Sequence, residues 1–222
     1  MDEISHCSHN IVANYQFCKT DFSKCLIITH YFCRKLLISV KNTLVQYDRA
    51  FDLCKDVFVK KAQDYGLSWT VLRPSSIADQ MYIKAKRIRT IEELGVQSIP
   101  DGIEQEYVGL VNYGIMALIQ LKHQLDEGSG LSISQVVKWY EETRDEVREL
   151  MVMKNSDYGE AWRDMRISSF TDMILMKLLR VREIEQNDGR TIISEGLPAN
   201  YSDMVNYAIF ALIKLEESQN IR

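Results

Sequence analysis

Apolar residues recur every three or four positions along most of the chain, which is the period of helices that bury one face. No stretch of useful length alternates apolar and polar residues, so strands are not expected. Polar turns containing Asp and Gly break the pattern, and serine pairs at Ser75-Ser76 and Ser168-Ser169 suit helix N-caps. The pattern predicts an all-α protein with lead-in helices at 42–64 and 134–157, middle helices after the serine pairs, and third helices near 104–122 and 202–217.

The helical pattern occurs twice. Residues 61–93 and 154–186 align at a constant offset, with 14 identical pairs out of 33. A second block, 102–121 and 196–215, has 10 identities out of 20 and lies one residue out of step with the first. We therefore expect a tandem duplication of a three-helix unit that forms a pseudo-two-fold helical bundle. The residues kept in both copies are mostly polar, which indicates selection for more than packing.

The duplication sets the expected domain boundaries. Residues 41–125 form the first repeat, 126–133 the linker and 134–222 the second repeat, since DEGSG at 126–130 is the one convincing linker. Residues 1–40 do not recur and hold four of the five cysteines. The spacing of these cysteines lacks the close pairs typical of zinc sites. We expect residues 1–40 to be a poorly ordered arm or to precede the true start of the protein.

Composition narrows the classes of function. The 222 residues carry a net charge of −4, which argues against a general surface for nucleic acid or anionic membranes. No apolar run reaches the length of a spanning helix, and the acidic start MDEIS is unlike a secretory signal. We expect a cytoplasmic protein with no membrane partner and no stable nucleic-acid binding, whose oligomeric state the sequence leaves open.

The middle helix of each copy places a lysine within an apolar seam. Lys84 and Lys177 each follow two apolar residues at helical spacing and precede two more. Arg87 and Arg180 follow three positions later, so each copy gathers two cations. A buried ammonium needs a carboxylate, carbonyls or a phosphate. Snorkelling to solvent or a structural ion pair is the alternative to a phosphate site.

The third helix of each copy holds an asparagine among apolar neighbours. Asn112 and Asn206 occupy equivalent positions, and a buried amide needs hydrogen-bond partners. We expect a neighbouring backbone group, or Asp79 and Asp172, to satisfy these amides, with ligand contact as the second interpretation.

The turn before each middle helix repeats a set of charged and aromatic residues. Gly66 and Gly159 are expected to adopt positive φ. The tyrosine and tryptophan of each turn are core anchors, or they stack on a base while Lys and Arg hold phosphate. The repeated side chains of the turns are Lys61, Asp64, Tyr65, Trp69 and Arg73, with Lys154, Asp157, Tyr158, Trp162 and Arg166 as their counterparts.

These residues resemble a known family. The K-x-x-DYG-x-x-W-x-x-x-R-x-SS run, the D-x-x-x-x-K-x-x-R helix and the V-NY-x-I-x-AL-I-x-L helix resemble the nucleotide modification associated domain 1 family, an uncharacterised helical domain. Both copies match, over about residues 41–218, and the tandem form is similar to proteins of Bacteroidetes-type bacteria. The resemblance implies an intracellular protein that contacts nucleotides near Asp64/Asp157, Lys84/Lys177 and Arg87/Arg180.

A more distant similarity is to the all-α nucleoside triphosphate pyrophosphohydrolases, which hold magnesium with E-x-x-E and E-x-x-D acids. The chain departs from that pattern, because Glu104 and Glu106 do not have E-x-x-E spacing. Gly109 also aligns with Asp203, and Glu106 aligns with Asn200, so the acid of the third helix lies one turn apart in the two copies. The similarity therefore implies that the first copy is a degenerate or purely supporting half.

The leading hypothesis is binding of a nucleotide or modified nucleotide in a cleft built from the DYG turns and the Lys/Arg faces of the middle helices, with phosphate-ester hydrolysis as its enzymatic version. In that version Asp157, Asp172 and Asp203 hold Mg²⁺ or position water. The competing hypothesis is a non-enzymatic interaction or scaffold module whose repeated polar residues form a structural network.

Overall fold

The computed structural model describes residues 22–96, 102–125, 130–193 and 195–220. Its contacts divide the chain into two units, Met1–Leu44 and Val45–Arg222. The first unit contains the beginning of helix α2, and residues 1–21 of the expected N-terminal arm lie outside the described residues. The second unit contains the first repeat from Val45 onward, the second repeat and all other described helices.

The described residues form helices and turns without a strand, which confirms the all-α prediction. None of the described helices is long and apolar enough to cross a membrane. The first helix begins at Phe22 rather than at residue 42, because residues 22–41 contain no Gly or Pro to end it. The elements in chain order are α2 (Phe22–Tyr65), η1 (Ser68–Val71), α3 (Pro74–Leu94), α4 (Ile103–His123), α5 (Ile133–Tyr158), η2 (Ala161–Asp164), α6 (Ile167–Gln186) and α7 (Leu197–Asn220).

Helix boundaries follow local chemistry, with one correction. Gly66 and Gly159 follow α2 and α5 at φ +66° and +60°, as expected from their place in the DYG turns. The prediction that the serine pairs cap the middle helices is wrong, because those helices begin earlier and their N-cap residues are Arg73 and Arg166. Pro74 takes the first position of α3, where its fixed φ suits a helix start.

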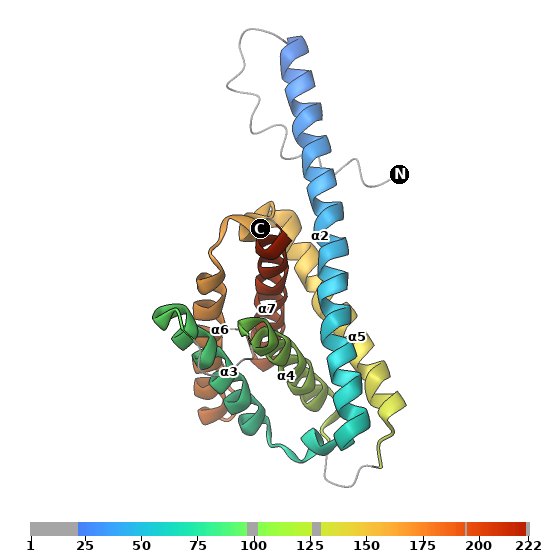
Figure 1. Ribbon diagram of the computed structural model, residues 1–222, viewed down its shortest axis with the longest axis vertical. Coiled ribbons are helices and arrows are strands. Elements are labelled where there is room, and N and C mark those ends of the chain that lie inside the picture. Colours follow the sequence, from blue (N-terminus) through green and yellow to red (C-terminus); the bar gives the residue numbers. More distant parts are fainter. Residues whose placement is uncertain (1–21, 97–101, 126–129, 194, 221–222) are drawn as a thin grey trace. The chain divides into compact units, whose positions relative to one another are not determined.

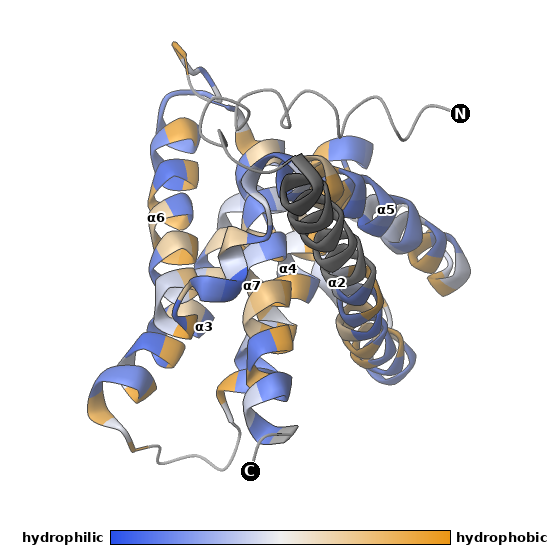
Figure 2. Ribbon diagram, turned by 90° about the horizontal axis from the view of Figure 1, so that it is seen from above, coloured by the Kyte–Doolittle hydropathy of each residue, from blue (hydrophilic) through white to orange (hydrophobic). Residues whose placement is uncertain are grey.

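Within the second unit, equivalent helices of the two repeats lie side by side in three layers. Helices α4 and α7 pack together at the centre, and α3 and α6 cover one side of them (Figure 1). Residues 45–65 of α2 and helix α5 cover the other side, joined by ion pairs such as Arg148 Nε to Asp48 Oδ1 at 2.7 Å. Figure 2 shows the same order from above, with hydrophilic residues along much of α5. This pairing of equivalent helices is the expected pseudo-two-fold bundle.

The core lies between the layers and uses the predicted seam of the middle helices. Ile77, Met81 and Ile88 of α3 are fully buried, as are Phe170 and Ile174 at the equivalent face of α6. Burying one such side chain contributes about 1.5–3 kcal/mol, so the seam is a main source of stability. The lysines in the middle of the seam therefore sit beside apolar side chains and need partners.

The central crossing of α4 and α7 depends on a glycine. A Cβ at Gly114 would lie 2.5 Å from Cγ2 of Val205. The side chain of Val205 therefore leaves no room for a larger residue than glycine at this position. We expect G114A to lower the free energy of unfolding by about 1–2 kcal/mol, because the cost of overpacking outweighs the better helix propensity of alanine. Urea denaturation measures this change.

G109A is the matched control on the same helix. The three atoms nearest to a Cβ at Gly109 all belong to the flexible end of Lys84, so alanine is expected to leave stability unchanged or raise it by up to about 1 kcal/mol. A G114A protein as stable as G109A would show that the α4–α7 contact adjusts without cost.

Candidate functional site

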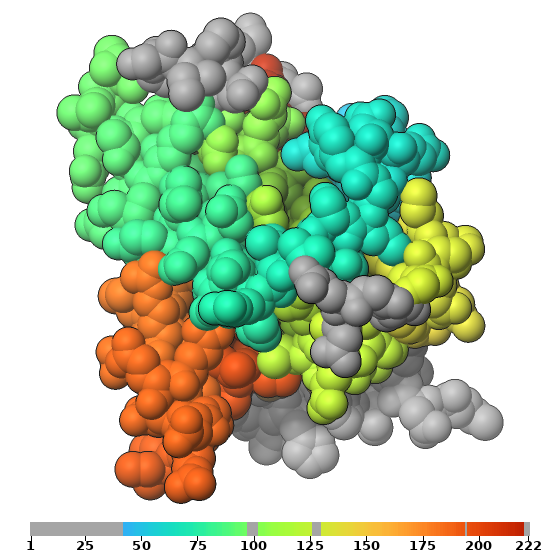
Figure 3. All heavy atoms as spheres, turned by 90° about the horizontal axis from the view of Figure 1, so that it is seen from below, coloured from blue at the N-terminus to red at the C-terminus, as the bar shows by residue number. Residues whose placement is uncertain are grey.

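The first repeat contains a cavity of about 640 Å³. Its walls come from α2, η1, α3 and α4, and Figure 3 shows the hollow between α2 and α3 with α4 behind it. The volume lies within the range typical of small-molecule sites. The polar and aromatic lining residues on which the argument depends are Lys61, Tyr65, Ser68, Trp69, Lys84, Glu104, Gly109, Asn112 and Tyr113.

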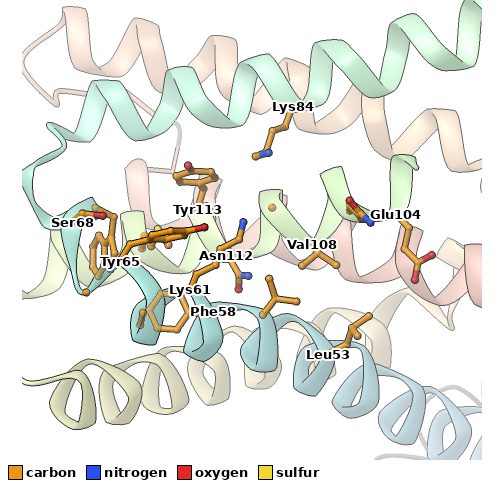
Figure 4. A pocket seen from close by; sticks show the side chains of 17 residues that line it. Leu53, Phe58, Lys61, Tyr65, Ser68, Lys84, Glu104, Val108, Asn112 and Tyr113 are labelled. Carbon is orange, nitrogen blue, oxygen red and sulfur yellow. The ribbon is translucent and has the colours of Figure 1, made fainter. Parts of the chain in front are cut away.

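Two lysines reach the cavity from different helices. Lys61 extends from α2 and Lys84 from α3 (Figure 4). The Nζ atom of Lys84 lies 3.2 Å from Oε2 of Glu106 and 5.9 Å from the ring centre of Tyr113. Lys61 is exposed and forms no ion pair with any residue that the structure describes. The cavity thus has a cationic wall, and Glu106 balances part of the charge on Lys84.

The DYG turn supplies aromatic surface at one end of the cavity. Tyr65 is 69% exposed, and its ring lies beside Ser68 at the end opposite Glu104 (Figure 4). Trp69 is buried and packs near Phe58, with ring centres 6.5 Å apart. The repeated aromatic residues therefore differ in role, because the tryptophan anchors the turn and the tyrosine offers an open ring.

Each turn is fixed to the third helix of its own repeat. The side-chain Nε2 of Gln120 donates to the carbonyl of Leu72 at 2.7 Å. At the equivalent place in the second repeat, the Nζ of Lys214 donates to the carbonyls of Arg163 and Met165. These bonds hold the end of each turn against α4 or α7.

The equivalent place in the second repeat holds an ion triad instead. The carboxylate of Asp203 lies between two ammonium groups, with Oδ1 2.6 Å from Nζ of Lys154 and Oδ2 2.6 Å from Nζ of Lys177. Asp203 and Lys177 are buried, with 7% and 8% of their side chains exposed. Burial, with Asp203 nearby, raises the pKa of Tyr207 to about 12. Lys177 is thus held by a structural ion pair and does not snorkel.

The two asparagines join the repeats. Asn112 Nδ2 donates to the carbonyl of Cys54 at 3.0 Å, and Tyr140 donates its hydroxyl to Asn112 Oδ1 at 2.9 Å. Asn206 repeats the arrangement with the carbonyl of Val147 and the hydroxyl of Tyr47. Each asparagine thus binds the lead-in helix of its own repeat and accepts from the tyrosine of the other. Backbone groups satisfy these amides as expected, whereas the predicted involvement of Asp79 and Asp172 is wrong.

Asp79 and Asp172 lie instead at the outer contact between α3 and α6. Arg182 Nη2 is 2.8 Å from Oδ1 of Asp79, and Arg89 Nη1 is 3.6 Å from Oδ1 of Asp172. Both carboxylates are mostly exposed. Equivalent residues again pair across the two repeats, so these aspartates join α3 to α6.

Other predicted residues lie at the surface or in the interior away from the cavity. Trp162 is buried and stacks on Phe210, with ring centres 4.3 Å apart. Arg87 pairs with Glu106. The three aspartates expected to act in catalysis (157, 172 and 203) lie at a helix end, at the α3–α6 contact and inside the triad, so they do not form one cluster. Besides Lys61, Tyr65, Asp79 and Asp172, the predicted residues exposed at the surface are Asp64, Arg73, Asp157, Tyr158, Arg166 and Arg180.

No group of three His, Cys, Asp or Glu side chains in the described part of the chain is placed to hold a metal ion. The three aspartates expected to bind Mg²⁺ therefore do not meet in one such group within the described residues, and the magnesium expectation stays a prediction.

The sequence pattern did not indicate the place of Tyr113 and Gly109 in the cavity. Tyr113 follows Asn112 and lies under the ammonium of Lys84, and its counterpart Tyr207 was equally visible in the repeat. Gly109 was noted as a loss of an acid, which assigned the first repeat a supporting role. The cavity lies in that first repeat.

Both repeats match one known protein family. The family described as "Nucleotide modification associated domain 1" matches residues 61–121 and 154–215, which is more than half of the chain. The chain belongs to this family. Both matched segments begin at the lysine before the DYG turn and end within the third helix, so the family unit contains the turn, the middle helix and most of the third helix. No curated protein and no solved structure matches the chain.

Proposed function

We propose that the cavity of the first repeat binds a nucleotide or a modified nucleotide. The observation that carries the proposal is the convergence of Lys61, Lys84 and the open ring of Tyr65 on one cavity of about 640 Å³. Membership of a family named for nucleotide modification points to the same class of ligand. Cations and an aromatic ring within one cavity match the two chemical parts of a nucleotide.

Each part of the ligand has a favourable place. A phosphate accepts hydrogen bonds from ammonium groups, and such charge-assisted bonds are about twice as strong as neutral ones. A base stacks on an exposed aromatic ring, which contributes about 1–3 kcal/mol per base. We place the phosphate near Lys61 and Lys84, whose ammonium groups line the cavity, and the base at the DYG turn, where the ring of Tyr65 lies beside Ser68 (Figure 4).

Hydrolysis is a separate question from binding. Among the residues described as lining the cavity, Glu104 is the one carboxylate, and it lies at the rim away from Tyr65. The binding proposal therefore stands on its own, and turnover with added Mg²⁺ or Mn²⁺ is a distinct measurement.

The test uses the full chain with ordinary deoxynucleoside triphosphates and those of 5-methyl- and 5-hydroxymethylcytosine, each with and without Mg²⁺ or Mn²⁺. A ligand at about 100 times its Kd adds about 2.7 kcal/mol of stability, which corresponds to a rise in Tm of about 5–10 °C for a chain of this size. Anion-exchange chromatography of the same samples detects hydrolysis. No shift with any nucleotide would overturn the proposal in favour of an interaction module.

Neighbouring lysines on α2 provide a matched pair of variants. We expect K61M to weaken nucleotide binding at least tenfold, because Lys61 faces the cavity. K60M is the control, since Lys60 is mostly exposed and pairs with Asp56 on the same helix. Equal affinity of K61M and K60M would place the ligand elsewhere.

A further inference from the structure

The acid of the third helix changes position between the repeats. The second repeat has Asp203 where the first has Gly109, and the first has Glu106 where the second has Asn200. In the second repeat the acid bridges two lysines, one from the lead-in helix and one from the middle helix. In the first repeat the acid lies one turn earlier and pairs with Lys84 and Arg87, both from the middle helix. The lysine of the lead-in helix, Lys61, is left without that carboxylate.

A cavity adjoins the position of the missing side chain. Gly109 lines the cavity together with Lys61 and Lys84, which are the counterparts of the two triad lysines. The stem of Lys84 lies over Gly109, where an added Cβ would be 2.7 Å from its Cδ and Cε atoms. The first repeat thus keeps both cations of the triad without its anion, with the Lys84 stem over Gly109 and the cavity beside it.

We propose that the phosphate of the bound ligand takes, between Lys61 and Lys84, the position that the Asp203 carboxylate takes between Lys154 and Lys177. This inference rests on the proposed nucleotide function of the cavity and adds the place of the anionic group. In the second repeat, the Asp203 carboxylate already occupies the equivalent anion position, so the chain binds one ligand.

The triad of Asp203, Lys154 and Lys177 shows which contacts an anion makes between two such lysines. Each oxygen of the Asp203 carboxylate meets one ammonium at 2.6 Å, and the side chains of Asp203 and Lys177 are largely shielded from water. A phosphate presents several oxygens of the same kind, so two of them can meet two lysines in the same way. Glu106 balances part of the charge on Lys84, and Lys61 has no such partner among the described residues. A ligand anion therefore adds the counter-charge that the first repeat lacks.

The test restores the acid to the first repeat. G109D places a carboxylate between Lys61 and Lys84, and G109N places a group of the same size without charge. Isothermal titration with a deoxynucleoside 5′-monophosphate and, separately, with inorganic pyrophosphate measures affinity and the number of sites on the full chain. We expect one site per chain in the unchanged protein, a loss of at least tenfold in G109D, and a distinctly smaller loss in G109N. Denaturation of each variant in urea shows that it is folded.

The outcomes separate this inference from the proposed function. Nucleotide binding that G109D leaves unchanged, equal losses in G109D and G109N, or two equivalent sites per chain would overturn the inference and keep nucleotide binding. Pyrophosphate binding that G109D removes, without nucleotide binding, would keep the anion position and overturn the nucleotide proposal. Failure of both probes in the unchanged protein would overturn both.

Discussion

D203N is expected to lower the free energy of unfolding by about 3 kcal/mol, since removing one partner of a buried ion pair leaves an uncompensated charge. Lys177 is 8% exposed and its ammonium meets Asp203 at 2.6 Å, so it has little access to water once the carboxylate is gone. Lys154 is 41% exposed and can turn to solvent. The cost of the substitution therefore falls mainly on Lys177.

D79N is the matched control for this prediction. It makes the same chemical change at an aspartate that is 61% exposed and paired with Arg182. Exposed pairs contribute about 0–1 kcal/mol, so D79N is expected to remain within that range. Urea denaturation of both variants measures the two free energies. If D203N were no more costly than D79N, Lys177 would have another way to satisfy its charge.

A double variant separates the charge from the packing. Replacing a whole buried ion pair by apolar residues of similar size is often neutral or stabilising by about 1–4 kcal/mol. K177M combined with D203L is therefore expected to recover most of the stability that D203N loses. The first repeat offers the comparison, because K84M breaks a pair in which the lysine side chain is 26% exposed, and its cost should be smaller.

The duplication explains why the fold was predictable from the sequence. Two copies with the same helical period and the same DYG turn fixed the number, order and approximate bounds of the helices. Buried polar residues such as Asn112 and Lys177 were visible as exceptions within apolar faces. The partners of these residues could not be identified from the pattern. Some partners come from helices of the other repeat, and the acid of the third helix is displaced by one turn between the repeats. The hydroxyl of Tyr140 at Asn112 is such a case.

The sequence pattern also did not predict the start of α2 or the location of the cavity. Residues 22–41 lack a counterpart in the second repeat, so the comparison of copies gave no boundary there. The cavity is lined by Gly109, and from the sequence alone a glycine in place of an acid indicates a lost function. The contrast with Asp203 becomes informative once both sites are seen in three dimensions.

Replacing either central asparagine is expected to cost about 2–3 kcal/mol, because its tyrosine partner is left buried without an acceptor. Tyr47 and Tyr140 are fully buried, and each donates its hydroxyl to the asparagine of the other repeat. We expect N206L and N112L to lose similar amounts of stability in urea denaturation. A loss below about 0.5 kcal/mol, which is typical of surface substitutions, would contradict a structural role for these amides.

Tyrosine variants test whether the loss comes from the orphaned hydroxyl. Y47F removes the group that N206L leaves without a partner, so the double variant is expected to be more stable than the sum of the two single changes predicts, by about 1 kcal/mol. N112L with Y140F should behave in the same way. Additive effects in both cycles would mean that the hydroxyls find other partners.

The two asparagines also differ in a way that separates structure from binding. Asn112 lines the cavity, whereas Asn206 lies near the filled triad of the second repeat. If both act only in packing, N112L and N206L will lower stability equally and leave the affinity for nucleotide unchanged. If the amide of Asn112 also contacts the ligand, N112L will weaken nucleotide binding and N206L will not. Because the stability costs match, a difference in affinity between these two variants reports on the ligand itself.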